Sequence, residues 1–541
     1  MNVLPTSYWP TDTSTEVRES TVGIVLREAA EKFGGAIALV EGIKAPAPDR
    51  RRLSFERLLG EAELVAGALL ERFEPGERIA VWAPNIPEWV LLELGAALAG
   101  IVLVTVNPAF KAEELDYVLR QSGAAGIFLV PKYRDNPMAA TLDRIRPGLR
   151  ALREAVLFSE WDAFVASGSP TPRFPDVRPV DAAQIQYTSG TTGFPKGAVL
   201  HHLGLTNNAR IFASIAGLGP SDTCVSPMPM FHTVGSVLAT LGTLQAGARH
   251  VLVHAFDPLL MLELVEAERG TVALGVPTML VAMLECPDLA TRDLSSLRVV
   301  LSGGSPVPAD LVRRIEETLK VTFSTQYGMT ECSPLVSQVR LDDSFTDRAQ
   351  TVGRPVPQTD VKVADPTTGG AVSCGVIGEV CVRGYCVMTG YFRMPEQTAA
   401  AIDGDGWYHT GDLASMDDRG FLRIEGRLKD MIIRGGENIY PREIEELLLQ
   451  HPKVAEVAVV GVPDPRWGEA VAAFLRCAPG QSATAGELTE YCMARLARHK
   501  VPRHWEFVDS FPLTPSGKIR KSVLRDRFVT RSSKTPTAKV L

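Results

Sequence analysis

Apolar positions in the first part of the chain follow two different spacings. Residues 53–73, 87–100 and 113–122 repeat apolar side chains every three or four positions, whereas 101–108 and 126–130 are short runs of mostly β-branched or aliphatic residues. The first spacing indicates helices with a buried face, and the second indicates buried strands. Helices that alternate with strands predict βα units around a largely parallel sheet.

The pattern changes twice further along. The alternation continues to about residue 328, but residues 352–426 contain short β-like runs between Gly and Asp turns, which predicts a small β-rich part. After residue 427, a helix beginning at Pro441 and further helix and strand signals predict a compact α+β module of about one hundred residues. Residues 530–541 are rich in Thr, Ser and Lys and are predicted to be disordered.

The composition is that of a globular protein built from several modules. The 541 residues are 45% hydrophobic and 22% charged, and this length exceeds what one simple core accommodates. A net charge of -7 gives no overall attraction for nucleic acid or for an anionic membrane, although a local basic groove stays open. The sequence leaves both a monomer and a homodimer open.

Cysteine usage and the N-terminus bear on the compartment. Eight cysteines without a CxxC pair or zinc-finger spacing indicate reduced thiols and predict a cytoplasmic protein. The first residues lack the features of a signal peptide, and their acidic residues argue against a transit peptide. The two most apolar stretches, 91–106 and 270–284, are interrupted by Glu93 and Pro277, so neither predicts a membrane span.

The strongest chemical signal is the segment YTSGTTGFPKG, residues 187–197, which follows a short strand-like run. Its small residues let successive backbone N–H groups converge on phosphate oxygens, its hydroxyls add donors, and Lys196 adds a compact positive charge. A flexible loop is the alternative interpretation, which the ordered hydroxyl, glycine and lysine positions disfavour. A Walker A loop needs Gly-Lys-Ser/Thr, whereas Pro195 and Gly197 flank the lysine here. The segment therefore predicts a phosphate site outside the P-loop class.

Four further motifs follow in order: QYGMTE (326–331), YHTGDL (408–413), GRLKDMIIRGGENIYPREIE (426–445) and PLTPSGKIRK (512–521). Together with residues 187–197 they resemble the motifs of the adenylate-forming superfamily, which includes acyl-CoA synthetases, peptide-synthetase adenylation domains and luciferases. The segments RGYCVMTGYF and KDMIIRGGENIYP are most similar to the medium-chain acyl-CoA synthetase family member 2 group.

The resemblance implies a fold, a reaction and a domain division. The fold is α/β, with a large multi-subdomain body of parallel sheets and a small β-barrel-like part, followed by a small mobile α+β domain. The implied domains are an adenylation body, 1–428, and a lid, 429–541, which rotates about a hinge at Lys429. The implied substrates are a carboxylic acid, ATP with Mg²⁺, and CoA, which pass through an acyl-adenylate. No nucleic-acid partner is expected.

The resemblance also implies roles for individual residues. Glu331 offers a hard oxygen ligand for Mg²⁺, Asp412 accepts hydrogen bonds from ribose hydroxyls, and the ring of Tyr327 stacks on adenine. The ATP or AMP site implied in this way comprises Thr188, Ser189, Gly190, Thr191, Thr192, Gly193, Lys196, Gly303, Gly304, Gln326, Tyr327, Gly328, Met329, Thr330, Asp412 and Arg427. Gly303 and Gly304 are expected to leave room for the flat base, and a plain strand-to-helix turn is the alternative.

The implied catalytic residues are Lys518, His232, Thr192 and Lys196. A carboxylate and a triphosphate repel each other, and a lysine placed between them at position 518 offsets this repulsion and stabilises charge in the transition state. The alternative is that Lys518 belongs to a solvated basic tail.

The remaining implied residues concern the acceptor and the acid. The CoA loop comprises Gly435, Gly436 and Glu437, and the acyl pocket comprises Phe231, His232, Gly235, Ser236 and Cys332. The small pocket residues are expected to leave space. His232 is the only Lys, Arg or His within 231–240, 302–305 and 328–333, which favours an acid with an apolar tail.

Three alternatives stay open at this point. The acid is a medium-chain fatty acid or, alternatively, an aryl acid such as a cinnamate. The acceptor is CoA or, alternatively, a carrier-protein thiol, an amine or another small nucleophile. A non-catalytic binder of the same fold is disfavoured, because Lys196, Glu331, Asp412 and Lys518 are all present.

Overall fold

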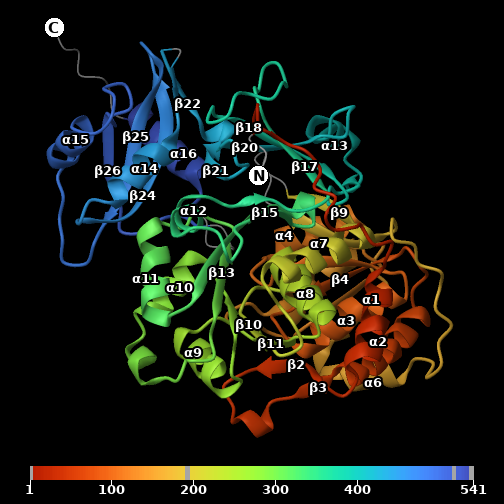
Figure 1. The fold of residues 1–541 in the computed structure, drawn as a ribbon. Coiled ribbons are helices and arrows are strands. Elements are labelled where there is room, and N and C mark those ends of the chain that lie inside the picture. The colour runs from red at the N-terminus through yellow and green to blue at the C-terminus, as the bar shows by residue number, and fades with distance from the viewer. Residues whose placement is uncertain (1–3, 189–194, 436, 514–518, 535–541) are drawn as a thin grey trace.

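The computed structural model describes residues 4–188, 195–435, 437–513 and 519–534. Figure 1 shows a large body, coloured red to green, beside a smaller unit, coloured blue, that contains the C-terminal residues. Within the described residues, no helix combines the length and the apolar character that crossing a membrane requires.

One sheet of the body has seven strands, and it presents the phosphate-loop segment. Its order is β19 (Gly390–Tyr391), β9 (Lys196–His201), β8 (Ala182–Thr188), β5 (Val102–Val106), β4 (Arg78–Trp82), β6 (Gly126–Leu129) and β7 (Glu154–Leu157). The strands from β8 to β7 are parallel, as the alternating pattern predicts, while β9 and β19 are antiparallel to their neighbours. The predicted helix at 53–73 is α2 (Phe55–Leu70), preceded by a short strand, and the one at 87–100 is α3 (Pro87–Leu98).

A second sheet of nine strands carries the QYGMTE motif. Its order is β16 (Arg354–Pro355), β15 (Leu335–Gln338), β14 (Thr322–Gly328), β13 (Val299–Gly303), β12 (Val272–Leu274), β10 (Thr223–Ser226), β11 (Arg249–Val253), β2 (Ile37–Gly42) and β3 (Arg52–Ser54). Its central strands, from β14 to β2, are parallel, and antiparallel strands close each end. The motif therefore begins at the carboxyl end of a parallel strand, where α/β folds place their ligand sites.

Helices surround these two sheets. They are α1 (Val22–Phe33), α4 (Ala112–Ser122), α5 (Met138–Ile145), α6 (Trp161–Ala166), α7 (His202–Ile215), α8 (Gly242–Ala246), α9 (Pro258–Ala267), α10 (Pro277–Leu284), α11 (Ala309–Leu319), α12 (Phe345–Gln350) and α13 (Pro395–Ala401). Helix α3 is apolar nearly all round and is buried except at Glu88, because it packs between α2, α1 and the first sheet.

The predicted β-rich part is a five-stranded antiparallel sheet. Its order is β1 (Tyr8–Trp9), β17 (Thr359–Ala364), β18 (Gly378–Gly384), β20 (Tyr408–Met416) and β21 (Leu422–Arg427). The edge strands β1 and β21 are not paired with each other in the described residues, so this sheet is open. The sequence pattern did not predict that two residues from the N-terminus would add its first strand.

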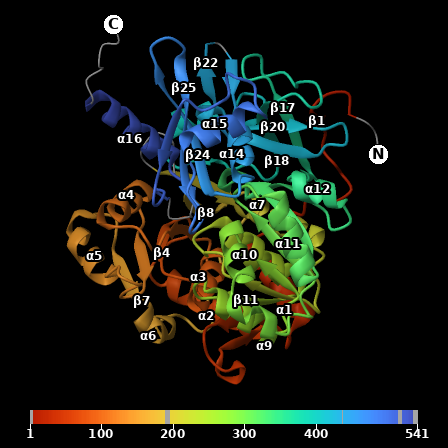
Figure 2. The same ribbon diagram turned by 90° about the vertical axis from the view of Figure 1, so that its left-hand side faces the viewer.

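The C-terminal unit has its own sheet and its own core. The sheet comprises β23 (Glu437–Ile439), β22 (Ile432–Arg434), β25 (Gly468–Cys477), β24 (Val454–Asp464) and β26 (His504–Phe507), with helices α14 (Pro441–Leu449), α15 (Ala485–Met493) and α16 (Lys521–Lys534). Its core includes Ile432, Ile444, Leu448 and Val459. Both views place it next to the sheet that contains β18 and β20 (Figures 1 and 2). The expectation of a disordered tail is wrong for residues 530–534, because α16 continues through them; residues 535–541 lie outside the described residues.

Candidate active site

The predicted phosphate loop joins two strands of the first sheet. Strands β8 and β9 form an antiparallel pair in which Thr188 lies opposite Lys196. Helix α4 contacts residues next to both ends of the loop. The Tyr117 hydroxyl donates to the Pro195 carbonyl at 3.0 Å, and the Tyr187 hydroxyl contacts Gln121. Both ends of the loop are thus held by side chains of α4. The remaining predicted phosphate ligands lie outside the described residues: Ser189, Gly190, Thr191, Thr192 and Gly193.

Glu331 lies beside the base of this loop, although 143 residues separate it from Thr188. The Thr188 hydroxyl donates to Glu331 Oε1 at 3.3 Å, and the Tyr391 hydroxyl donates to the same oxygen at 2.9 Å. The Lys196 ammonium lies over the Tyr391 ring, 4.6 Å from its centroid. Burial and the neighbouring Glu331 raise the pKa of Tyr391, so its hydroxyl stays a donor at neutral pH. The predicted phosphate-binding segment and a buried carboxylate suited to a hard cation therefore lie side by side.

Asp412 connects the predicted adenine and ribose motifs. The Tyr327 hydroxyl donates to Asp412 Oδ2 at 2.9 Å, and Arg427 Nε lies 2.9 Å from Oδ1. Asp412 and Arg427 are also opposite each other in the pair formed by β20 and β21. A carboxylate oxygen can accept more than one hydrogen bond, which suits the ribose role predicted for Asp412. Burial and the Asp412 charge raise the pKa of Tyr327 well above its ordinary value.

The predicted glycines differ in their surroundings. A Cβ at Gly303 would lie 2.6 Å from the Gln326 carbonyl oxygen, and one at Gly328 would lie 2.0 Å from the Pro334 carbonyl oxygen. These two glycines therefore permit close strand packing, and the room expected for a flat base at Gly303 stays a prediction. Gly304 does leave open space, because it has a φ of +75° and nothing lies within 4 Å of its Cβ position.

Three more predicted site residues, Gln326, Thr330 and Glu331, lie in or just after strand β14. Gln326 is 9% exposed, and its amide Nε2 has no hydrogen-bond partner in the described part of the chain. Thr330 and Glu331 form the short turn that follows Met329, and both are buried.

His232 is placed by an unusual helix. Its Nδ1 accepts a hydrogen bond from the Val234 N–H at 3.3 Å, which in the neutral ring leaves the proton on Nε2. The segment η4 (Val234–Leu241) that follows is a π-helix, a rare form that is frequent at functional sites. Before it, the Phe231 carbonyl accepts from the Thr105 hydroxyl at 3.0 Å. His232 is therefore held as a potential donor at a rigid strand-to-helix junction.

The predicted acyl-pocket residues do not all leave space. A Cβ at Gly235 would lie 2.3 Å from the Pro229 carbonyl oxygen, so this glycine permits close packing of the π-helix. Ser236 and Cys332 are both 0% exposed, and neither faces an open cavity in this conformation. The small size of Gly235 therefore serves packing in this conformation, and an acyl pocket at Gly235, Ser236 and Cys332 stays a prediction.

Comparison with known proteins decides the family. The model of the AMP-binding enzyme family matches residues 26–392, and that of the AMP-binding enzyme C-terminal domain matches residues 443–518. The chain belongs to the AMP-binding enzyme family. The predicted membership of the adenylate-forming superfamily and the predicted enzyme class, an AMP-forming acid–thiol ligase, are confirmed.

Relatives and solved structures cover nearly the whole chain. YngI of Bacillus subtilis is 40% identical over 95% of this chain and 98% of its own length, and the mouse protein named medium-chain acyl-CoA ligase ACSF2, mitochondrial, is 37% identical over 96% and 90%. ATP-bound MatB from Rhodopseudomonas palustris is 31% identical with a TM-score of 0.85, over 94% of this chain and 99% of that one. The anthranilate CoA ligase AuaEII with anthranoyl-AMP is 26% identical with a TM-score of 0.86, over 96% and 99%. The predicted fold class, an α/β body with a separate C-terminal domain, is confirmed.

In this AMP-binding enzyme the predicted hinge lies between the body and the C-terminal unit. Lys429 is in a short turn, η7 (Leu428–Asp430), and burial lowers its pKa. Gly435 follows with a φ of +61°, and its N–H donates to the Trp467 carbonyl at 2.8 Å. A Cβ at Gly435 would lie 2.7 Å from the Trp467 ring, so only glycine allows this ring to cover the loop. Glu437 is exposed, and Gly436 lies outside the described residues.

The predicted catalytic lysine, Lys518, also lies outside the described residues. The residues on either side of its segment are described. Leu513 and Ile519 form an antiparallel bridge, and the Arg520 N–H donates to the Pro512 carbonyl at 2.8 Å. The segment 514–518 therefore begins and ends at one place on the C-terminal unit.

Sequence reasoning missed a buried polar chain beneath the π-helix. The Gln184 amide donates to Glu93 at 2.6 Å, and the Gln186 amide donates both to Gln184 at 2.8 Å and to the Ser236 hydroxyl at 3.2 Å. Burial raises the pKa of Glu93 well above its ordinary value, which favours the neutral carboxyl group. The polar residues Gln184 and Gln186 within an otherwise apolar strand, and Glu93 within an apolar helix, were the available signal.

Tyr391 was also missed, because a tyrosine in the segment GYF carries no chemical signature of its own. Its place beside Glu331 depends on strand β19, two residues long, pairing with β9. This pairing brings residue 391 to the base of the phosphate loop, between Lys196 and Glu331.

Proposed function

We propose that this AMP-binding enzyme activates a medium-chain fatty acid, or a related hydrophobic acid, with ATP and then transfers the acyl group to CoA. The observation that carries the proposal is the convergence of Thr188, Lys196 and Glu331 at one edge of the first sheet. It combines phosphate donors with a buried carboxylate, which is the set that a metal-bound triphosphate requires.

In the first step, a carboxylate oxygen of the acid attacks the α-phosphorus of ATP, and the bond to the β-phosphate breaks. Pyrophosphate leaves with the bonding electrons, and the product is an acyl-adenylate. Lys196 and Lys518 offset the repulsion between the two anions. Glu331, which is 8% exposed and receives hydrogen bonds from Thr188 and Tyr391, fits a Mg²⁺ ligand. Bound Mg²⁺ would neutralise phosphate charge.

His232 and Asp412 hold the two substrates for this step. The Nδ1 of His232 accepts from the Val234 N–H, and we place the other side of the ring toward the carboxylate of the acid. Asp412, fixed by Tyr327 and Arg427, accepts from the ribose hydroxyls. The nucleotide is thus oriented by groups that are already ordered, which lowers the entropic cost of reaching the reactive geometry.

In the second step, the CoA sulfur attacks the acyl carbon, the bond to AMP breaks, and the thiol proton passes to solvent. The C-terminal domain, 429–541, is proposed to rotate about Lys429 and to exchange Lys518 for the loop that contains Gly435 and Glu437. The Trp467 ring is 36% exposed beside Gly435, and the guanidinium groups of Arg434 and Arg466 lie 5.9 and 4.9 Å from its centroid. An exposed aromatic ring between two cations suits a phosphorylated nucleotide such as CoA.

The comparisons support a choice of acid and keep two alternatives. Mammalian relatives at 36 or 37% identity are named medium-chain acyl-CoA ligases. The anthranilate CoA ligase AuaEII supports an aryl acid as the alternative. The amide bond synthetase McbA from Marinactinospora thermotolerans, 29% identical over 94% of this chain and all of that chain with a TM-score of 0.81, supports a non-thiol acceptor as the other. The eight free cysteines agree with the reducing, cytoplasmic compartment that we propose.

A substrate panel tests the proposal. Pyrophosphate release is measured with short, medium and long straight-chain acids, with cinnamate and anthranilate, and with amino acids, each with and without CoA. We expect the highest kcat/KM with a medium-chain acid and one acyl-CoA formed for each pyrophosphate. A preference for an aryl acid would contradict the choice of acid, and pyrophosphate release with no acyl-CoA product would contradict the choice of acceptor.

A further inference from the structure

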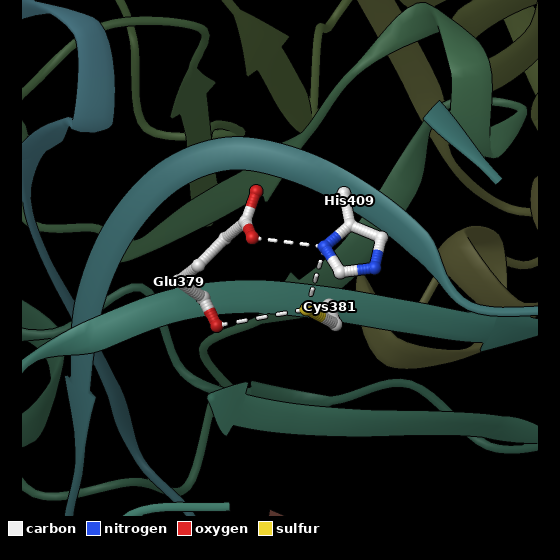
Figure 3. A group of neighbouring side chains, drawn as sticks. All are labelled: Glu379, Cys381 and His409. Carbon is white, nitrogen blue, oxygen red and sulfur yellow. Dashed lines mark hydrogen bonds and ion pairs between the residues drawn. The ribbon is translucent and has the colours of Figure 1, made fainter. Parts of the chain in front are cut away.

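Glu379, Cys381 and His409 form a cluster on two neighbouring strands, and the predicted site residues include none of the three. Figure 3 shows the three side chains pointing toward one another from β18 and β20. His409 Nδ1 lies 2.9 Å from Glu379 Oε2 and 3.6 Å from the Cys381 sulfur. His409 Nε2 lies 3.4 Å from Asp403 Oδ2, in the turn that precedes β20.

The geometry of this cluster is that of a hydrogen-bonded network of a histidine and two carboxylates. Nδ1 of His409 faces the carboxylate of Glu379, and Nε2 faces that of Asp403. Burial raises the pKa of Cys381 to about 12, which keeps the thiol protonated. Burial alone lowers the pKa of His409, but the carboxylates of Glu379 and Asp403 outweigh this and raise it above its ordinary value. The two carboxylates therefore favour the protonated form of His409.

The second oxygen of Glu379 has a different partner. Glu379 Oε1 accepts a hydrogen bond from the Gly411 N–H at 3.0 Å, one residue before Asp412. The pairing of β18 with β20 explains why the Gly411 N–H needs a side-chain acceptor. Cys381 lies opposite His409, and Glu379 lies opposite Leu413. One residue of β18, Val380, therefore faces three residues of β20, 410–412. Residues 410–412 thus bulge out of the ladder, and the Glu379 carboxylate supplies an acceptor that the neighbouring strand does not.

The same bulge is held on its other side by Thr410. The Thr410 hydroxyl donates to the Val380 carbonyl at 2.7 Å and accepts from the Asp412 N–H at 3.0 Å. Gly411 has a φ of +68°, which lets the chain turn sharply enough to aim the Asp412 carboxylate at Tyr327 and Arg427. The direction of Asp412 therefore depends on β18 through two side-chain contacts.

We propose that the charged His409 and Glu379 are positioning residues that set the affinity of this enzyme for ATP. Protonated His409 compensates the charge of the largely buried Glu379 carboxylate, which accepts the hydrogen bond from the Gly411 N–H. When His409 loses its proton, the carboxylate is left in a less favourable environment and the bulge that presents Asp412 loosens. ATP affinity then falls as the pH rises through the pKa of His409. This inference rests on the proposed contact between Asp412 and the ribose.

Few titratable or charged groups surround His409 among the described residues. Glu379 and Cys381 lie on β18, Asp403 lies in the preceding turn, and Lys362 on β17 approaches Cys381. Asp403 Oδ1 accepts from the N–H groups of Asp405 and Trp407, and an asparagine keeps this acceptor. Asp403→Asn removes one of the two charges that raise the His409 pKa, and the pH midpoint of the effect should therefore move to lower pH.

The experiment measures KM for ATP and kcat in acid-dependent pyrophosphate release between pH 6 and 9. We expect KM of the wild type to rise with pH, the midpoint to shift down in Asp403→Asn, and His409→Gln to show a KM raised about tenfold at neutral pH and little pH dependence. His409→Arg, which keeps the charge, should recover part of the affinity, and kcat should change less than KM in every variant. His451→Gln is the matched control, because His451 also pairs with a carboxylate, Glu487 at 3.6 Å, but lies in the C-terminal unit.

Two outcomes separate this inference from the proposed function. If Asp412→Ala raises KM for ATP but His409→Gln and Asp403→Asn leave both KM and its pH profile unchanged, the positioning role is wrong and the nucleotide site stands. If Asp412→Ala itself leaves KM unchanged, the proposed ribose contact is wrong. Thermal unfolding midpoints measured for each variant show whether it is folded at the assay temperature. If His409→Gln is not folded there, Asp403→Asn provides the test.

Discussion

Tyr391→Phe removes one hydroxyl and keeps the ring, so it isolates a single hydrogen bond in the site. Its hydroxyl donates to Glu331 Oε1 at 2.9 Å, and both side chains belong to buried residues that are 8% exposed. Water does not readily replace a donor lost at such a position, and a buried hydrogen bond to a charged group contributes about 1.5–3 kcal/mol. The Thr188 hydroxyl, at 3.3 Å, remains as the other donor to this oxygen. Lys196 keeps its contact with the ring.

If Glu331 holds the metal of the metal–triphosphate complex, this loss reduces kcat/KM for ATP by about ten- to one-hundredfold. The metal dependence should also shift, because a displaced carboxylate binds Mg²⁺ more weakly. The assay is acid-dependent pyrophosphate release at fixed ATP over a series of Mg²⁺ concentrations. Tyr491→Phe is the matched control, since it removes the same atom from a tyrosine of the C-terminal unit that packs on His451 and Arg495. Unchanged kcat/KM and unchanged Mg²⁺ dependence in Tyr391→Phe would refute the reasoning.

Three further predictions concern other parts of the site. Lys518→Ala should abolish acyl-adenylate formation but leave CoA transfer from supplied acyl-adenylate largely intact, and equal loss of both half-reactions would contradict the division of labour between the two domains. Trp467→Ala should raise KM for CoA several-fold, with acid-dependent ATP–pyrophosphate exchange unchanged; an unchanged KM for CoA would mean that the ring does not contact this substrate. Gly235→Ala should lower the free energy of unfolding by about 1–3 kcal/mol, because its Cβ would lie 2.3 Å from the Pro229 carbonyl oxygen; a thermal midpoint equal to that of the wild type would show that the π-helix shifts without cost.

Much of the fold could be predicted from local patterns. The alternating spacing of the first 130 residues predicted the strands β5 and β6 and the helices α2, α3 and α4, because buried strands and helices with a buried face each leave a distinct pattern. The addition of Tyr8–Trp9 to the β-rich sheet could not be predicted, since two residues carry no periodicity and their partner, β17, lies about 350 residues away. Helix α16 was missed at its end, where the composition suggested disorder.

Some residues of the candidate site could likewise be predicted from the sequence, and others could not. Glu331, Asp412 and Lys196 were recognisable because each lies within an ordered motif, and the structure brings Glu331 and Lys196 to one place through Tyr391. Tyr391 itself could not be predicted, because its position depends on which strand pairs with which. The glycines were visible in the sequence, but their roles could not be predicted from it. Their small size was visible in the sequence, but whether it admits a ligand or a neighbouring backbone depends on packing, and at Gly235 the neighbour is the Pro229 carbonyl.

The position at which ATP is cleaved tests the central claim most directly. The enzyme is incubated with ATP, Mg²⁺, CoA and a medium-chain acid, and the phosphorus-containing products are identified by NMR as the acyl-CoA accumulates. Attack of the acid on the α-phosphorus predicts AMP and pyrophosphate, in equal amounts to each other and to the acyl-CoA. Formation of ADP and inorganic phosphate in step with the acyl-CoA would contradict the adenylate mechanism.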